Sequence, residues 1–232
     1  MKTNTAILPE SRRLIMLFLK RRGEATAGEL AEHLGVTREA ARQQLQLLET
    51  EGWIARGERQ AAEGAGRPSV NYQITPAGDH LFPKNYDALS MTLVDAVASQ
   101  LGPEALEKLL ASITEQQVRH WEPKLAGLSL PERIKALKGI YMDEDPHISM
   151  RKDARGYVLV ERNCPFLNVA LRRPQLCSIT INTLTRLLGV RVVREERFQD
   201  GDRRCVFRIL EDQPVDTVDY RFTFEEPAAH AA

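Results

Sequence analysis

The sequence has little cysteine and no long hydrophobic run. It contains three cysteines in 232 residues. An odd number of cysteines in a chain without a secretory leader pattern argues against a disulfide framework and leaves metal binding, redox sensing or simple burial. No apolar run approaches the roughly 20 residues that cross a bilayer. The first residues lack the basic and apolar regions of a secretory signal, so we expect a soluble, cytoplasmic protein.

The sequence also lacks an excess of charge and the motifs of common enzymes. Its 32 Lys and Arg residues balance 32 Asp and Glu residues, so the total charge does not indicate a polyanionic partner. It has no glycine-rich nucleotide loop and no HExxH sequence, and none of its five histidines lies close in sequence to a cysteine. We therefore expect no enzyme, with a thiol-dependent enzyme as the least favoured alternative.

What the first third does contain is the pattern of a helix-turn-helix. An apolar stripe predicts a helix over residues 10–22. Thr26 and Glu29 match the S/T-x-x-E capping box, which begins a second, short helix. Thr37 caps a third helix, which ends before Gly52. A tight LGV turn joins the second helix to the third, as in a helix-turn-helix.

The third of these helices has one apolar and one polar face. Ala41, Leu45 and Leu48 fall together on a helical wheel and predict the buried face. The opposite face carries long polar side chains, namely Glu39, Arg42, Gln43 and Gln46. Arginine and glutamine suit base edges and phosphates in a DNA major groove, although a simply solvated face is the commoner meaning of such a stripe.

A hairpin is predicted after the third helix, because residues 53–75 read as a strand, a glycine-rich tip and a second strand. A hairpin that follows a recognition helix is a wing, and arginines on it suit the phosphate backbone or the minor groove. The predicted DNA contacts are Thr37, Arg38, Arg42, Gln43, Gln46, Arg56, Arg59 and Arg67. The run from Ser11 to Pro83 resembles the winged helix-turn-helix of ArsR and DeoR-like bacterial repressors. The resemblance implies a homodimer that binds a double-stranded DNA operator.

The middle of the chain, residues 84–145, reads as helical. Leu89, Leu93 and Val97 recur every four residues, as in a helix that packs on a core or on a partner helix. Because a DNA-binding protein of this kind needs two-fold symmetry, we expect a dimerisation region here. The acidic turn at 143–146 predicts the next domain boundary, and a metal site in that turn is the less favoured interpretation.

The last third holds all three cysteines. Its pattern predicts strand, strand, helix, helix, strand, strand, which is a small α+β domain. Cys164 closes a strand, Cys177 lies near a helix start and Cys205 begins a strand, whereas packing cysteines tend to lie in the middle of elements. Arg203 and Arg204, just before Cys205, are expected to favour its thiolate. None of the spacings is a compact CxxC, so spacing alone is as compatible with incidental thiols as with a metal site.

Nearly the whole chain resembles the SufR-type iron-sulfur-responsive repressors, in the winged helix-turn-helix and in the segments ERNCPFLNVA, PQLC, LLGV and GDRRCVFRI. The resemblance implies that Cys164, Cys177 and Cys205 hold an iron-sulfur cluster of the 4Fe-4S type. It also implies repression of genes that build such clusters, relieved when the cluster is lost. Some members have a fourth cysteine, which this chain lacks. The candidates for the remaining ligand are His147, Asp143, Glu144 and Asp202.

Together these patterns predict an α+β protein in four parts. The parts are a winged helix-turn-helix DNA-binding domain at 1–83, a helical linker and dimerisation region at 84–145, an α+β cluster-binding domain at 146–225 and a disordered tail at 226–232. We expect an iron-sulfur-dependent transcriptional repressor. The alternative is a winged-helix regulator that senses zinc or thiol oxidation through the same cysteines.

Overall fold

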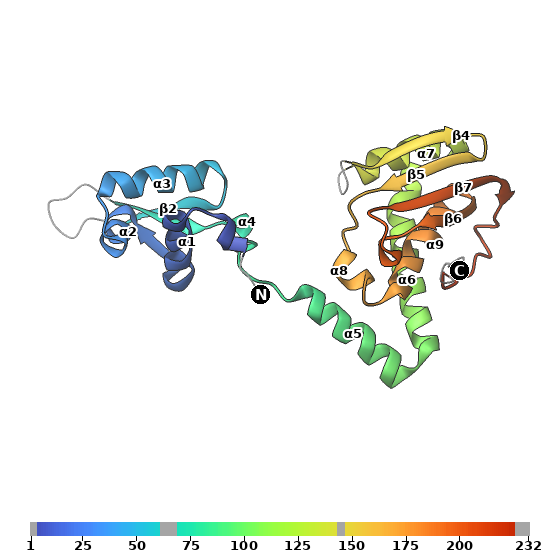
Figure 1. The fold of residues 1–232 in the computed structure, drawn as a ribbon, viewed down its shortest axis with the longest axis horizontal. Helices are drawn as coiled ribbons and strands as arrows, with labels where there is room; N and C mark the ends of the chain where they lie inside the picture. Colours follow the sequence, from blue (N-terminus) through green and yellow to red (C-terminus); the bar gives the residue numbers. More distant parts are fainter. Residues whose placement is uncertain (1–3, 61–68, 143–146, 226–232) are drawn as a thin grey trace. The chain divides into compact units, whose positions relative to one another are not determined.

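The computed structural model describes most of the chain, namely residues 4–60, 69–142 and 147–225. The chain forms two compact units, Met1–Asn85 and Tyr86–Ala232, which are considered one at a time (Figure 1). Arg67, the acidic turn at 143–146 and the tail at 226–232 lie outside the described residues, so the predictions made for them stay predictions. No helix in the described ranges is long and apolar enough to cross a membrane.

The first unit packs its helices on a small antiparallel sheet. Its elements are η1 (Asn4–Ile7), α1 (Glu10–Arg22), β1 (Glu24–Thr26), α2 (Ala27–Leu34), α3 (Arg38–Thr50), β2 (Ile54–Gln60), β3 (Ser69–Ile74) and α4 (Pro76–Asp79). The strand order is β1-β3-β2, in which β2 and β3 pair as the predicted hairpin. The predicted first helix is confirmed, as are the predicted helix starts at Thr26 and Thr37.

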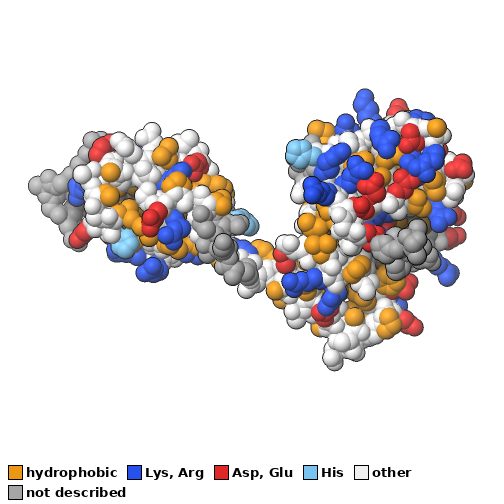
Figure 2. All heavy atoms as spheres, in the orientation of Figure 1, with side chains coloured by type: hydrophobic (Ala, Val, Ile, Leu, Met, Phe, Trp, Pro, Cys, Tyr) orange, Lys and Arg blue, Asp and Glu red, His pale blue; other side chains and the backbone are white. Residues whose placement is uncertain are grey.

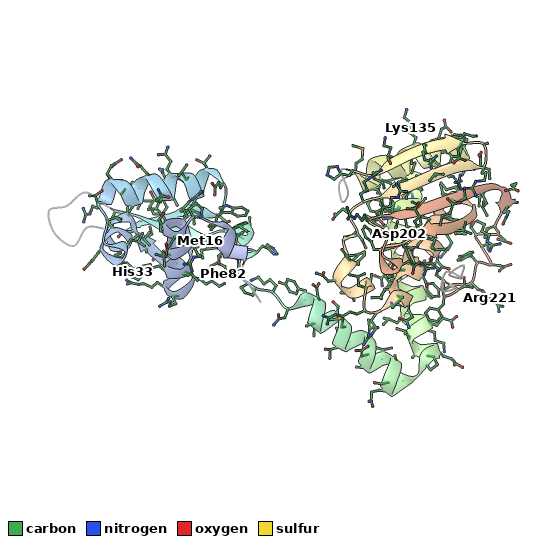
Figure 3. All side chains as sticks on the ribbon, viewed as in Figure 1. Met16, His33, Phe82, Lys135, Asp202 and Arg221 are labelled. Carbon is green, nitrogen blue, oxygen red and sulfur yellow. The ribbon has the colours of Figure 1, made fainter. Side chains whose placement is uncertain are left out.

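The core of the first unit fixes the direction of α3. Met16 and Leu19 of α1 and Leu45 and Leu48 of α3 are at most 1% exposed. Met16 and Phe82, both labelled in Figure 3, belong to this core. Burying each such side chain contributes about 1.5–3 kcal/mol to the free energy of unfolding. The face of α3 opposite the core is therefore held toward solvent.

The second unit is built on a four-stranded antiparallel sheet with the order β4-β5-β7-β6. Its elements are α5 (Tyr86–Leu101), α6 (Pro103–Trp121), η2 (Glu122–Lys124), α7 (Leu130–Tyr141), β4 (Ser149–Asp153), β5 (Gly156–Glu161), α8 (Leu167–Ala170), η3 (Pro174–Leu176), α9 (Cys177–Leu188), β6 (Val190–Glu196), η4 (Phe198–Asp200) and β7 (Cys205–Pro214). The predicted order of strands and helices in the last third is confirmed.

One face of this sheet is covered by α6, α7 and α9 (Figure 1). Val118 of α6, Leu137 of α7 and Leu184 of α9 pack with Leu159 and Phe207 of the sheet in a single core. Two helices of the predicted dimerisation region thus share their core with the sheet that follows. The apolar residues of α6 and α7 pack against the sheet, so these two helices belong to the same folded unit as the strands that follow.

The opposite face of the sheet carries a small apolar cluster of Val158, Val160 and Val206 beside ion-paired side chains. Arg208, only 3% exposed, bonds to Glu195 at 3.1 Å and to Asp153 at 2.7 Å. Figure 2 shows basic and acidic side chains side by side over the second unit. These charges neutralise one another locally, so this face does not form a patch of one sign.

Helix α5 differs from the other long helices because none of its residues is buried. Leu89, Leu93 and Leu101 are 59%, 58% and 69% exposed. The helix packs on α6 and α8 within the second unit. Its predicted apolar stripe is therefore covered only in part.

Candidate functional site

The turn between α2 and α3 is defined by local hydrogen bonds. Thr26 N donates to Glu29 Oε2 at 2.8 Å, and Glu29 N donates to Thr26 Oγ1 at 3.3 Å. Gly35 ends α2 in the left-handed conformation, with φ of 64°. Ala40 N then donates to Thr37 Oγ1 at 3.2 Å, which begins α3. These caps fix the ends of both helices, so α2 and α3 keep the defined relation that a helix-turn-helix requires.

The outer face of α3 carries unburied hydrogen-bonding side chains. Arg42, Gln43 and Gln46 are exposed, as the helical wheel predicts. Arg42 lies 3.7 Å from Glu39, but both side chains are more than 60% exposed, at 62% and 71%. An exposed pair of this kind contributes little, about 0–1 kcal/mol, so it does not prevent Arg42 from reaching a base or a phosphate. This face has the chemistry of a recognition helix.

Two further predicted contacts, Arg38 and Arg56, lie against other residues of the first unit. A side chain at Gly28 would place its Cβ 3.2 Å from Arg38 Nη2, so glycine leaves room for that guanidinium against α2. Arg56 on β2 pairs with Glu49 on α3 at 3.0 Å, which links the hairpin to the helix. Arg59 lies on β2 opposite Val70, and its side chain is outside what the structure describes.

The three cysteines, far apart in sequence, come together at one end of the second sheet. Cys205 is the first residue of β7 and Cys177 is the first residue of α9. Cys164 lies in the loop after β5 and not at the strand end itself. Arg194 Nη1 donates to Cys205 Sγ at 3.2 Å, while its Nη2 donates to the carbonyl of Cys177 at 3.0 Å. A single guanidinium therefore joins the two buried cysteines.

A cavity of about 400 Å³ opens beside these cysteines. Cys164, Cys177, Glu161 and Arg194 line it, together with apolar side chains from α5, α6, α8 and α9. Apolar walls of this kind limit the access of water to anything bound at the sulfur atoms.

Burial controls the protonation of all three thiols. It raises the pKa of Cys164 to about 11, assisted by the nearby charge of Glu161. Burial also raises the pKa of Cys177 and of Cys205, and the charge of Arg194 opposes the rise at both. Without a bound metal the thiols are therefore protonated near neutral pH. A metal that binds them displaces those protons.

The arginine beside the thiols is Arg194 and neither of the two arginines, Arg203 and Arg204, that the sequence indicated. Arg204 pairs with Glu196 at 2.6 Å, and Arg203 is exposed. The prediction that these two favour the thiolate is therefore wrong, because β7 begins only at Cys205 and the preceding turn lies outside the core. Arg194, whose side chain is 3% exposed, takes that place and pairs with Glu225 at 3.0 Å.

Sequence reasoning missed four residues of this site: Glu161, Arg194, Gln199 and Glu225. A signal for two of them was present. In β6 the inward positions are Val190 and Val192, so the next inward position is the charged Arg194. Glu161 likewise follows Leu159 on the inward side of β5. A charged residue at the buried phase of a strand pattern indicates a buried polar site.

The donor atoms of the site can be compared with what a metal ion or a cluster requires. In the described part of the chain, no three His, Cys, Asp or Glu side chains are arranged to hold one ion. A cluster instead takes one thiolate per iron, so its cysteines do not converge on a single point. Gln199 Oε1 and Glu225 Oε2 are buried beside the thiols without a hydrogen-bond partner. Such atoms are expected where a bound group is to supply contacts.

Two of the residues predicted as candidates for the remaining ligand, His147 and Asp202, make other contacts in the structure. His147 is exposed, and its carbonyl accepts from Arg162 Nη1 at 3.2 Å. Asp202, labelled in Figure 3, accepts from Arg197 N at 3.0 Å and so stabilises the turn before β7. Asp143 and Glu144 lie outside the described residues.

The comparison with known families gives a match within the first unit. Residues 11–60 match the family model described as an HTH domain. The match runs from α1 through β2 and so includes the recognition helix. No curated protein matches the chain. The fold and the match together support a helix-turn-helix DNA-binding transcriptional regulator.

Proposed function

We propose that the protein is a homodimeric transcriptional repressor whose DNA binding depends on an iron-sulfur cluster, of the 4Fe-4S type, held by Cys164, Cys177 and Cys205. The observation that carries the proposal is the arrangement of these cysteines in the unit that follows the helix-turn-helix in the chain. Cys164 and Cys177 line one cavity, and Arg194, which also lines it, donates to Cys205 Sγ. Because the chain resembles SufR-type repressors, we infer that its target genes encode proteins that build iron-sulfur clusters. Loss of the cluster releases the operator and raises their expression.

The chain supplies most of what such a cluster needs. When bound, the cluster would supply iron that oxidants and chelators can attack. The cysteines provide soft sulfur ligands, which select iron-sulfur clusters, zinc or copper(I) over hard cations. Arg194 donates to Cys205 Sγ and offsets part of the negative charge of the thiolates. The apolar walls of the cavity keep bulk water away from the sulfur atoms.

Hydrogen bonds connect the cysteine loop to α5, which directly follows the first unit in the chain. Asn168 Nδ2 donates to Asp87 at 2.8 Å, and Arg173 pairs with Asp95 through two nitrogens. Both donors lie between Cys164 and Cys177, so ligation at the two cysteines restrains the loop that holds α5. A hundredfold change in DNA affinity requires a coupling of only about 2.7 kcal/mol.

We also assign the surface through which the homodimer forms to α5. Its exposed leucines leave an apolar surface without a partner in the described chain. Two-fold pairing through this surface would set the spacing of two recognition helices, which a palindromic operator requires.

A switch that works by thiol oxidation is less well supported. The thiolate is the form that reacts with oxidants, and burial raises the pKa of all three thiols. A zinc site is the other alternative, and the described residues offer no converged set of ligands for it.

The test is the visible absorption spectrum, with iron and sulfide content, of protein purified without oxygen. We expect a brown protein with matching iron and sulfide, and loss of both in Cys164→Ser while circular dichroism shows the fold retained. A colourless protein that contains zinc or no metal would overturn the cluster and leave a helix-turn-helix regulator with another signal.

A further inference from the structure

A segment without helix or strand, residues 215–225, follows β7 and returns to α9 (Figure 1). We call this segment the C-terminal strap. We propose that the strap closes the cysteine site by positioning Arg194 through Glu225, and that opening of the strap sets the rate at which the cluster is lost. The inference rests on the proposed function, because it needs a cluster at the cysteines.

The strap is fastened to α9 by two buried polar side chains. Asn182, 0% exposed, donates from Nδ2 to the carbonyl of Thr223 at 2.9 Å. Its Oδ1 accepts from Tyr220 Oη at 2.8 Å and from Thr223 N at 3.1 Å. One turn earlier on α9, the buried Ser178 Oγ accepts from Glu225 N at 2.8 Å. The strap therefore contacts two successive turns of α9.

These contacts fix the direction of the strap. From Thr223 to Glu225 the strap advances two residues, which span about 7 Å when extended. From Asn182 back to Ser178, α9 covers about 6 Å. Because the two lengths agree, the strap runs along α9 toward the first residue of that helix, which is Cys177. Glu225 therefore lies at the cysteine end of α9.

Glu225 connects the strap to the thiols through Arg194. The ion pair between Glu225 Oε1 and Arg194 Nε is 3.0 Å long, and the two side chains are 12% and 3% exposed. The same guanidinium donates to Cys205 Sγ and to the carbonyl of Cys177. A buried guanidinium is destabilising when its anionic partner is removed. The strap thus provides the charge that keeps Arg194 between the two cysteines, which makes Glu225 a positioning residue.

The strap is also built to open more easily than the core. No residue of the strap is fully buried, and Val218 and Phe224 are 90% and 37% exposed. Its contacts are mostly hydrogen bonds, which water replaces on opening, so each one stabilises the closed form only slightly. Segments with few buried apolar contacts open locally while the rest of the fold stays intact. Each opening withdraws Glu225 from Arg194 and weakens the hold on both cysteines.

The experiment uses three variants that each change one side chain. Glu225→Gln removes the charge that faces Arg194. Tyr220→Phe removes the hydroxyl that donates to Asn182 and leaves the ion pair unchanged. The control is Glu211→Gln, which removes a charge of the same kind from another part of the second unit.

Glu211 is a matched control because it also pairs with a cation, Lys152 at 3.2 Å, but further along β7 from Cys205. All proteins are loaded with cluster without oxygen. The decay of visible absorbance with a chelator gives the rate of cluster loss, and a redox titration gives the midpoint potential of the cluster. Hydrogen exchange at residues 220–225, with and without cluster, reports opening of the strap, and thermal melting verifies folding.

We expect Glu225→Gln to lose the cluster about tenfold faster than wild type. Its midpoint potential should shift to a more positive value, because the charge of Arg194 is no longer offset. Tyr220→Phe should speed both exchange of the strap and cluster loss about two- to tenfold, with an unchanged potential. Glu211→Gln should match wild type in all three measurements.

Three outcomes would overturn these assignments. A Glu225→Gln variant with the potential and the loss rate of wild type would exclude Glu225 as a positioning residue. Faster exchange of the strap in Tyr220→Phe without faster cluster loss would exclude the strap as the element that controls loss. Failure of wild type to hold any cluster would overturn the proposed function, and this inference with it.

Discussion

At the scale of single residues, Arg194 accounts for much of the site. A buried guanidinium is stable only when its charge and donors are compensated. Here Glu225 supplies the charge, Cys205 and the carbonyl of Cys177 accept hydrogen bonds, and the Phe207 ring lies 4.7 Å from the guanidinium carbon. The arginine therefore holds the starts of α9 and β7 together before any metal binds. Such a prearranged site lowers the cost of ordering ligands on metal binding.

The thiols of the metal-free protein should react slowly with alkylating agents at neutral pH. The pKa of Cys164 is about 11, whereas an ordinary cysteine has 9.0, so its thiolate fraction rises only as the pH approaches 11. Alkylation of the Cys164 peptide, followed by mass spectrometry between pH 7 and pH 11, should show this late rise in the folded protein. Alkylation in denaturant is the reference, with a rise near the ordinary value. Fast labelling of the folded protein at pH 7 would contradict the account and favour a thiolate sensor.

Arg42 is the residue on α3 whose loss should cost most in DNA recognition. Arg42→Ala should weaken binding to the operator by about 1–3 kcal/mol and relax its sequence preference. Fluorescence anisotropy with operator and scrambled DNA measures both effects. Arg119→Ala is the control, since Arg119 is another exposed helical arginine with an acidic neighbour, in the second unit. Equal affinities for Arg42→Ala and wild type would remove α3 from the interface.

At the scale of elements, the loop between β5 and α9 is the link between the cysteines and α5. If Asp95 and Arg173 transmit the state of the cluster, then Asp95→Asn should reduce the DNA affinity of the loaded protein toward that of the metal-free protein. The visible spectrum should stay unchanged, because the variant does not touch the sulfur atoms. The exposed Glu104 on α6 offers the control Glu104→Gln. A variant that keeps both spectrum and full affinity would exclude this route.

Much of the element structure follows from local rules in the sequence. The capping boxes at Thr26 and Ser129, the glycine that ends α2 and the alternation in the strands all act over a few residues, and the structure agrees with each. The order β4-β5-β7-β6 does not follow from local rules, because β5 and β7 are separated by four helical segments and β6. Only that pairing places Glu161 opposite Cys205. Local patterns could have marked Arg194 and Glu161 as buried charges, but which residues meet at the site was not predictable from neighbouring residues.

At the scale of the whole molecule, the account requires two copies of the chain. The double variant Leu89→Glu with Leu93→Glu places charges on the exposed apolar face of α5. It should convert a dimer into monomers in sedimentation equilibrium at micromolar concentration and weaken operator binding, because one recognition helix reads too few base pairs. Val218→Glu is the control, at a residue that is 90% exposed. A double variant that stays dimeric would move the interface away from α5.

The central claim is that cluster occupancy sets DNA affinity, and one measurement tests it most directly. The dissociation constant for the operator is measured without oxygen on a single preparation, before and after the cluster is removed by a chelator. The account predicts that removal weakens operator binding about a hundredfold, and that reconstitution restores it. Unchanged affinity through removal and reconstitution would contradict the account, and would leave the cysteine site without a role in the switch.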